Sequence, residues 1–281
     1  MKKTPKTVFI TGASSGIGLA TAGYFHEQGW NVVATMRHPE KRHTPLHEIG
    51  LPEILHLDVT DETSIYEAVN QTTKKYQRVD VLVNNAGYAV YGPFETTSPD
   101  QIRREYDTNV FGLMAVSRAF LPIFRNQKGG TLINVASMGG RIGFPLYSIY
   151  NSTKWAIEGF SESLMYELKP LNIKVRLIEP GVVKTDFYDR SLDRADTSNL
   201  PDAYAGIIER GKKTLGNYPN QKGTDPEVIA REIFRAAIDT GWRLRYTVGQ
   251  DAQLAQFFRR LIPEEMFFRV MEQITLYPLK K

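Results

Sequence analysis

A tyrosine and a lysine four residues apart, Tyr150 and Lys154, open a stretch whose pattern predicts a helix over Tyr150–Leu171. Residues four apart lie on the same face of a helix, so the phenol and the ammonium are predicted to be neighbours. A phenol has a pKa near ~10, and a nearby cation favours its ionised form. The pair is therefore predicted to exchange a proton with a substrate oxygen as general acid and base.

Two further polar side chains are candidates for the same chemistry. Ser137 follows the apolar run Gly130–Val135, and its hydroxyl can hold a substrate oxygen and stabilise the charge that develops there. Asn109 lies inside the long predicted helix Gln101–Asn126. Taken singly, these residues have ordinary interpretations: a strand-end hydroxyl, a helix-surface amide and, for Tyr150, a packing aromatic. The prediction rests on their combination.

A glycine-rich turn follows the first apolar run, Thr7–Thr11, and leads into a predicted helix. Glycines allow a tight turn and close backbone approach, and a helix N-terminus offers N–H groups to a pyrophosphate. The alternative is an ordinary strand–helix turn, which the position after the first strand disfavours. We expect the turn to bind a dinucleotide through Gly12, Ser14, Ser15, Gly16, Ile17 and Gly18.

Short apolar runs rich in Val and Ile alternate with amphipathic stretches, which predicts right-handed βαβ units. The expected fold is α/β, a single-domain Rossmann-type doubly wound parallel sheet of about seven strands spanning residues 1–281. The expected strands are Thr7–Thr11, Asn31–Met36, Glu53–Asp58, Val79–Val83, Gly130–Val135, Ile173–Ile178 and Tyr246–Val248.

Three regions depart from the alternation. Prolines in His38–Pro52 predict a short or broken helix. Residues 186–223 are polar and rich in Gly and Pro, and such a long irregular segment is predicted to be a substrate loop or lid. Residues 251–275 carry two apolar stripes separated by Pro263, which predicts a C-terminal extension of two amphipathic helices. The extension could pack on the domain or a subunit, cover the pocket, or touch a membrane reversibly.

Composition narrows the function classes. The net charge is +4 and the basic residues are dispersed, whereas nucleic-acid binding requires a concentrated stripe. No apolar run approaches the ~20 residues of a membrane span, and the N-terminus lacks the pattern of a signal peptide, so a cytoplasmic location is expected. There is no cysteine. Pro45 separates His43 from His47 and no third ligand is evident, so no metal is expected.

In this order and spacing, the motifs resemble the short-chain dehydrogenase/reductase family over about residues 7–185. The turn resembles that of the shorter-chain branch of carbonyl reductases and alcohol dehydrogenases, and the C-terminal part is loosely similar to members that act on retinol or hydroxysteroids. The resemblance implies hydride transfer between a nicotinamide and a lipophilic carbonyl compound or alcohol. The residues that carry it are Gly12–Gly18, Asp58-Val59, Asn84–Gly87, Asn109, Ser137, Tyr150, Lys154 and Pro180-Gly181.

The resemblance also implies roles for these residues. Asn109 would hold a water in a proton relay to Lys154, and Lys154 would bind the nicotinamide ribose. Asp58 and Val59 would contact the adenine. The wall beside the adenosine ribose would comprise Asn85, Ala86 and Gly87, and the carboxamide grip would comprise Pro180, Gly181, Val183 and Thr185.

The substrate pocket is expected to be mostly apolar and aromatic, which suits a lipophilic substrate. Relatives usually pair through the Gln101–Asn126 and Tyr150–Leu171 helices, so a homodimer or homotetramer is expected by resemblance. The expected lining comprises Ser137, Met138, Ile142, Phe144, Tyr147, Tyr150, Phe187 and Tyr188, with Val90, Tyr91 and Tyr204 from the same loops.

The end of the second strand predicts the cofactor. A residue that recognises the adenosine ribose is expected ~20 residues beyond the glycines, and that position is near Arg37, with no carboxylate before Glu40. An arginine can make bidentate bonds to a phosphate, which predicts NADP(H), although Ser15 replaces a basic residue that many NADP-preferring relatives have. The alternative for Arg37 is a solvated charge. The alternative function is a non-catalytic NADP(H)-sensing protein, which would have no need of the Tyr150–Lys154 pair.

Overall fold

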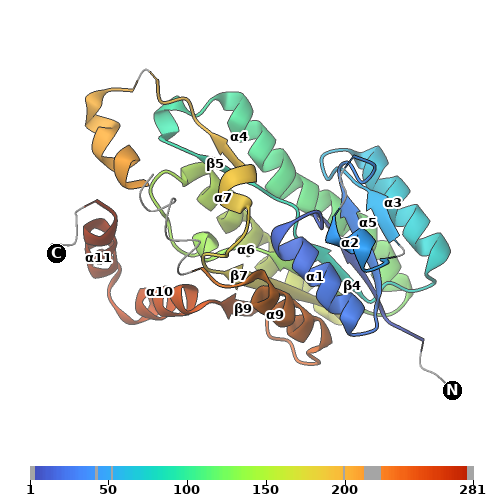
Figure 1. Ribbon diagram of the computed structural model, residues 1–281. Helices are drawn as coiled ribbons and strands as arrows, with labels where there is room; N and C mark the ends of the chain where they lie inside the picture. The colour runs from blue at the N-terminus through green and yellow to red at the C-terminus, as the bar shows by residue number, and fades with distance from the viewer. Residues whose placement is uncertain (1–3, 42–43, 52, 199, 212–222, 277–281) are drawn as a thin grey trace.

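Seven strands form one parallel sheet in the order β3-β2-β1-β4-β6-β7-β9. The computed structural model describes residues 4–41, 44–51, 53–198, 200–211 and 223–276 (Figure 1). This is the predicted α/β fold of Rossmann type, with all neighbouring strands parallel. The strands are β1 (Thr7–Ile10), β2 (Asn31–Met36), β3 (Glu53–His56), β4 (Val81–Asn84), β6 (Gly130–Val135), β7 (Ile173–Pro180) and β9 (Arg245–Val248).

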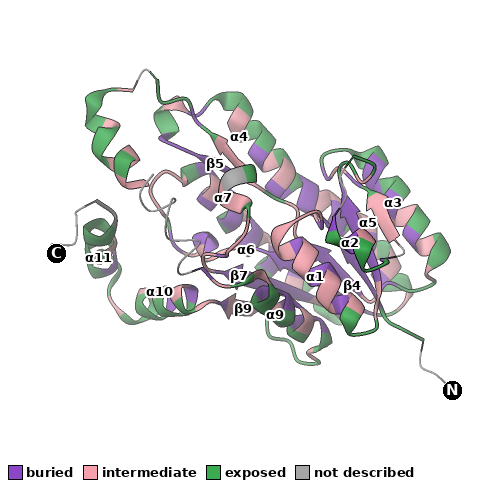
Figure 2. Ribbon diagram, in the orientation of Figure 1, coloured by how far each residue is buried: buried purple, intermediate pink, exposed green. Residues whose placement is uncertain are grey.

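Helices cover both faces of the sheet, and this explains why its central strands are mostly apolar. Alternate residues of a strand point to opposite faces. Val8 and Ile10 accordingly lie in the core under α1 (Gly16–Glu27) and α9 (Pro226–Ile238), whereas Phe9 lies in the other core. Figure 2 shows the buried strands between exposed helix faces. The second core is covered by α3 (Glu62–Lys75), α5 (Leu113–Asn126) and α6 (Ser148–Leu168).

The strand order reverses between β1 and β4, and the segments that follow these two strands meet there. The Thr11 N–H donates to the Val83 carbonyl at 3.0 Å. The Thr11 hydroxyl accepts the Asn85 N–H at 3.0 Å and the Ala86 N–H at 3.1 Å. In open α/β sheets, ligands bind in the crevice at this switch point.

The single helix predicted over Gln101–Asn126 is wrong in detail. The chain forms α4 (Pro99–Tyr106), a π-helical turn (Asp107–Gly112) and then α5. A Cβ at Gly112 would lie 2.8 Å from the Val59 carbonyl oxygen, so the turn packs very closely on the segment after β3. Single π turns within helices occur frequently at functional sites. The short helix expected in His38–Pro52 is α2 (Pro45–Glu48).

The irregular structure predicted for residues 186–223 is also wrong for much of its described part. This part contains α7 (Phe187–Arg190), β8 (Leu192–Arg194), a 3-10 turn (Asp202–Tyr204) and helical residues 205–211. Strand β8 pairs in parallel with β5 (Ala89–Tyr91), which the sequence analysis also missed. Three residues are too few to show the alternation that identifies a strand, and each of these two strands forms only because it pairs with the other, which is distant in the sequence. Residues 212–222 lie outside the described part.

Two amphipathic helices follow β9, as the apolar stripes predicted. They are α10 (Gln250–Leu261) and α11 (Glu264–Leu276), and Pro263 separates them. Figure 1 shows α10 beside β9 and α11 next to the C-terminus. Within the described residues, no helix combines the length and apolar character that a bilayer span requires.

Candidate active site

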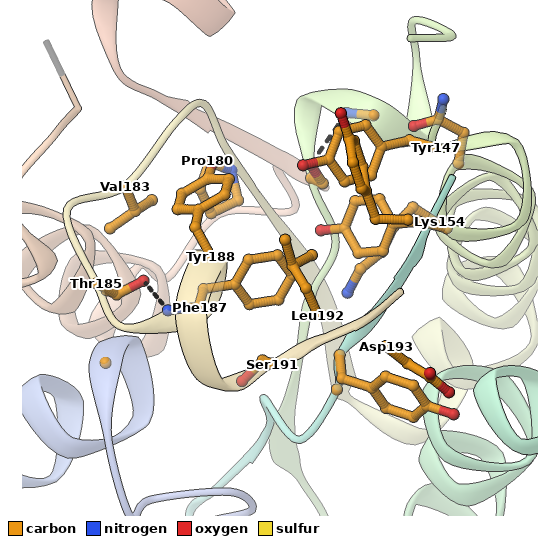
Figure 3. A pocket seen from close by; sticks show the side chains of 18 of the residues that line it. Tyr147, Lys154, Pro180, Val183, Thr185, Phe187, Tyr188, Ser191, Leu192 and Asp193 are labelled. Carbon is orange, nitrogen blue, oxygen red and sulfur yellow. Dashed lines mark hydrogen bonds between the residues drawn. The ribbon is translucent and has the colours of Figure 1, made fainter. Parts of the chain in front are cut away.

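One long cleft of about 1560 Å³ follows the carboxyl ends of the central strands. Figure 3 shows Pro180 at the end of β7 and Phe187 and Tyr188 of α7 facing Tyr147 and Lys154. Most of the residues predicted to bind a cofactor line this cleft, together with Tyr150 and Lys154. They are Gly12, Ser14, Ser15, Gly16, Ile17, Arg37, Asp58, Val59, Asn85, Ala86, Gly87, Pro180, Gly181, Val183 and Thr185.

The glycine-rich turn carries the N-terminus of α1 into the cleft. Gly12 and Gly16 have φ angles of 67° and 55°, a left-handed conformation that favours glycine. Gly18, also predicted as a cofactor contact, is not among the residues that line the cleft. A Cβ at Gly18 would overlap the Gly12 carbonyl oxygen, so this glycine serves the packing of helix on turn.

The predicted adenosine end lies where β2 and β3 finish. Arg37 is exposed and lines the cleft, whereas Met36 beside it is buried. Asp58 is held in place because its Oδ1 accepts the Thr60 N–H at 3.0 Å and the Thr60 hydroxyl at 2.8 Å. Asp61 caps α3 by accepting the Thr63 N–H, so Asp58 is not occupied as the helix cap.

Tyr150 and Lys154 share one face of α6. The Lys154 Nζ lies 5.6 Å from the centroid of the Tyr150 ring and donates to the Val135 carbonyl at 3.0 Å. Burial lowers the pKa of Lys154 to about 8 and raises the pKa of Tyr150 to about 12. Burial is the largest cause of both shifts, so the ionisation of the phenol beside the ammonium stays a prediction for the cofactor-bound protein.

Ser137 is oriented by the turn that it begins. Its Oγ accepts the Gly139 N–H at 3.0 Å, at the start of the 3-10 turn Met138–Gly140. A hydrogen bond with Ser137 opposes the effect of burial and lowers the pKa of Tyr150. The hydroxyl and the phenol are therefore partners at one end of the cleft.

Asn109 lies behind the cleft rather than on its surface. It is 1% exposed, and its Nδ2 donates to the Tyr88 carbonyl at 2.8 Å and the Thr153 Oγ1 at 3.1 Å. Its Oδ1 accepts the Tyr88 N–H at 3.0 Å. A Cβ at Gly87 would lie 2.9 Å from this oxygen and 3.9 Å from the Lys154 Nζ, so Asn109 and Lys154 flank the same glycine.

A buried glutamate next to this network was missed by the sequence analysis. Glu105 is 0% exposed, accepts the Val90 N–H at 2.9 Å and accepts from the Asn109 Nδ2 at 3.3 Å. Burial raises the pKa of Glu105 to about 8. The available signal was an acidic residue one helical turn before Asn109.

The end of the cleft that contains Tyr150 is rich in aromatic side chains. Ring centroids lie 6.0 Å apart for Tyr147 and Tyr150, 6.0 Å for Tyr150 and Phe187, and 5.5 Å for Phe187 and Tyr188. Burial raises the pKa of Tyr147. Seven of the eight predicted pocket residues line the cleft: Ser137, Met138, Phe144, Tyr147, Tyr150, Phe187 and Tyr188.

Ile142 is the exception and corrects the prediction: it is 2% exposed and is not part of the lining. Of the three loop residues named with the pocket, Tyr91 lines the cleft, whereas Val90 and Tyr204 do not. Val90 is buried, and the Tyr204 phenol donates to Glu95 at 2.6 Å. The unforeseen residues in the lining include Leu146, Ile207, Asp251, Met271 and Ile274.

Metal-ligating side chains do not cluster in the part of the chain that the structure describes. Of the histidine pair considered above, residue 43 lies outside the described residues. The His47 Nδ1 accepts the Thr44 N–H at 3.1 Å.

Comparisons with known proteins agree with this geometry. The family model described as short chain dehydrogenase matches residues 6–195. The chain is 40% identical over 251 residues to a 3-ketodihydrosphingosine reductase of Bacteroides thetaiotaomicron, covering 89% of this chain and 90% of the relative. It is 33% identical over 263 residues to retinol dehydrogenase 8 of Bos taurus, covering 90% and 76%.

Solved structures give the same result. A short-chain dehydrogenase from Streptomyces avermitilis superposes with a TM-score of 0.82 at 32% identity, covering 98% of this chain and 97% of that one. A 3-ketoacyl-(acyl-carrier-protein) reductase from Brucella melitensis complexed with NADH gives 0.71 at 26% identity, with coverage of 87% and 96%. ElxO with NADP bound gives 0.70 at 27% identity, with coverage of 87% and 98%. Similar structures thus hold either dinucleotide.

Proposed function

The chain belongs to the short-chain dehydrogenase/reductase family, and we propose that it transfers hydride between NADP(H) and a lipophilic carbonyl compound or alcohol. The observation that carries the proposal is the continuity of one cleft from the glycine-rich turn and Arg37 to Tyr150. Its volume of about 1560 Å³ exceeds the ~300–1,000 Å³ of a pocket for one small ligand. A dinucleotide and a substrate can therefore share it.

The residues at the first end suit a dinucleotide phosphate. Within the described chain, the Ser15 side chain makes no capping hydrogen bond at the start of α1. The Ser15 side chain therefore does not compete with phosphate oxygens for the N–H groups of the first helical turn. We assign the 2′-phosphate of NADP(H) to Arg37, because buried Met36 offers no carboxylate to a ribose hydroxyl.

The residues at the second end suit proton transfer. When bound, the nicotinamide supplies hydride in reduction and accepts it in oxidation. Tyr150 holds its proton at Oη, because burial raises its pKa to about 12, and donates it to the carbonyl oxygen. Ser137, oriented by the Gly139 N–H, donates to the same oxygen. The Lys154 ammonium stabilises the phenolate that remains, and Asn109 positions the Gly87–Tyr88 backbone.

The proposed substrate is lipophilic because many of the side chains that line the cleft with Tyr150 are aromatic or aliphatic. Phe144, Phe187 and Ile207 line the cleft, and Met271 and Ile274 of α11 add apolar surface from the C-terminal extension. We therefore favour the pocket-cover interpretation of that extension. The names of two relatives contain a keto compound and retinol, so ketones and alcohols are the first classes to test.

The test is a screen of lipophilic ketones, aldehydes and alcohols in which NADPH or NADP absorbance is followed. Turnover of at least one class, with stronger turnover for longer apolar substrates, is the expected result. Tight NADPH binding without turnover of any class would instead favour the NADP(H)-sensing alternative. Failure to bind either dinucleotide would contradict both functions.

A further inference from the structure

The first turn of α10 is anchored to the loop that follows β7. The Asp251 Oδ2 accepts the Val182 N–H at 2.8 Å. The Gly181 N–H donates to the Val248 carbonyl at 2.8 Å, just before α10 begins. Asp251 also lines the main cleft, beside Pro180 and Gly181. The start of the C-terminal extension therefore lies directly against this loop.

The Asp251 carboxylate is packed closely against two glycines, Gly181 and Gly249. A Cβ at Gly181 would overlap the Asp251 Oδ1, and a Cβ at Gly249 would lie 2.6 Å from the same oxygen. Real Cβ atoms essentially never approach within 3.0 Å of another heavy atom. Gly249 also has a φ of 102°. A side chain at either position would therefore have to displace the Asp251 carboxylate.

A second contact from α10 holds the other end of the same segment. Gln256 is 8% exposed, and its Nε2 donates to the Glu179 Oε2 at 2.9 Å. Glu179 is 0% exposed and directly precedes Pro180, and the Thr247 hydroxyl donates to the same oxygen at 2.7 Å. The segment from Glu179 to Val182 is therefore held by α10 at both ends.

We propose that Asp251 is a positioning residue for the nicotinamide half of the cofactor. By holding the Val182 N–H, it sets the path of the backbone from Gly181 to Val183, to which the carboxamide grip is assigned. This inference rests on the proposed function. The adenosine half is assigned to the ends of β1, β2 and β3, with Gly12, Arg37 and Asp58. Loss of the Asp251 anchor should thus affect one half of the ligand selectively.

The test compares two ligands in full-length protein. Dissociation constants are measured by calorimetry for NADPH and for adenosine 2′,5′-bisphosphate, which lacks the nicotinamide half. Asp251→Ala should weaken NADPH binding about tenfold, the effect of losing one charge-assisted hydrogen bond. Binding of the fragment should change less than ~2-fold, because changes at distant, independent sites affect each other little. Asp251→Asn keeps an acceptor oxygen and should restore most of the NADPH affinity.

Two further variants complete the design. Glu265→Ala removes an exposed acid of α11 and should change neither constant. Gly181→Ala displaces the same backbone from the loop side, and it should repeat the selective loss of NADPH affinity if Asp251→Ala does not fold. If binding of both ligands weakened equally, or if NADPH binding were unchanged in folded variants, the positioning role of Asp251 would be overturned and the proposed function would stand. Wild-type protein that binds neither ligand would overturn the proposed function and this inference with it.

Discussion

Burial is the largest influence on the pKa values of Tyr150 and Lys154. It raises the pKa of the phenol to about 12 and lowers the pKa of the ammonium to about 8. At neutral pH the pair therefore consists of a protonated phenol and a charged lysine. In the proposed mechanism, this is the state from which a carbonyl oxygen would receive a proton.

Tyr150→Phe removes the proposed proton donor and leaves the ring. Turnover is expected to fall by at least ~10²-fold, the lower range for loss of a general acid. NADPH affinity should be largely retained, because the phosphate-binding turn lies at the other end of the cleft. Steady-state kinetics and a binding titration measure the two effects separately. Near-wild-type turnover would remove Tyr150 from the mechanism.

Arg37 is expected to set the cofactor preference. A charge-assisted contact with the 2′-phosphate contributes ~1.5–3 kcal/mol, which corresponds to a ~10- to 150-fold preference for NADPH over NADH. Solvent screening favours the lower end, because Arg37 is exposed. The double variant Met36→Asp/Arg37→Ile should reverse the preference by supplying a hydroxyl acceptor and repelling the phosphate. The measurement is kcat/KM for each cofactor at fixed ionic strength, and a wild type that prefers NADH would contradict the assignment.

At the scale of elements, α10 and α11 contact different parts of the cleft. Helix α10 holds the loop after β7 through Asp251 and Gln256. Helix α11 instead contributes the apolar side chains Met271 and Ile274 to the lining. We therefore expect the two helices to be separable in function, α10 acting on the cofactor and α11 on the substrate.

Deletion of residues 263–281 tests this separation. Loss of the α11 side chains should raise KM for a lipophilic substrate at least ~5-fold, about 1 kcal/mol, since full burial of one such side chain contributes ~1.5–3 kcal/mol. NADPH affinity should stay within ~2-fold, because α10 remains. Kinetics and calorimetry on the truncated and full chains check both values. A truncation that weakens NADPH binding and leaves KM unchanged would contradict the assignment.

At the scale of the whole molecule, buried carboxyl groups link stability to pH. Glu105 is 0% exposed and Glu158 is 4% exposed, and burial raises the pKa of each from 4.5 to about 8. Glu158 also contacts Arg245 at 2.9 Å. Between pH 4.5 and about 8, these two groups therefore bind more protons in the folded protein than in the unfolded chain. The contribution of both carboxyl groups to the free energy of unfolding is fully present below pH 4.5 and is lost as the pH rises through about 8.

The free energy of unfolding is therefore expected to fall between pH 5 and 8. Glu105→Gln cannot ionise and retains an acceptor for the Val90 N–H, so the variant should lose less stability than the wild type over this range. Denaturant unfolding at several pH values measures both slopes. Identical slopes would show that Glu105 does not carry a raised pKa. Homo-oligomeric assembly and a cytoplasmic location remain predictions at this scale.

The alternation of strand and helix patterns was sufficient to predict the sheet, because burial on both faces is recorded locally as apolar runs. The spacing of motifs was sufficient to propose the glycine turn, Ser137, Tyr150 and Lys154. Each motif is short and directly follows a predicted strand or lies in a predicted helix, so the order of the elements already brings these residues to one edge of the sheet. Most predicted residues accordingly line one cleft.

Only the tertiary structure decided which side chains reach the cleft and what state they adopt there. Gly18 and Ile142 are removed from the lining by close packing and burial, whereas Met271 and Ile274 are brought to it by the course of α11. The Asp251 contact joins residues 69 positions apart, and no local pattern encodes such a distance. Burial, which sets the pKa of Tyr150, likewise depends on elements packed around it from distant parts of the chain.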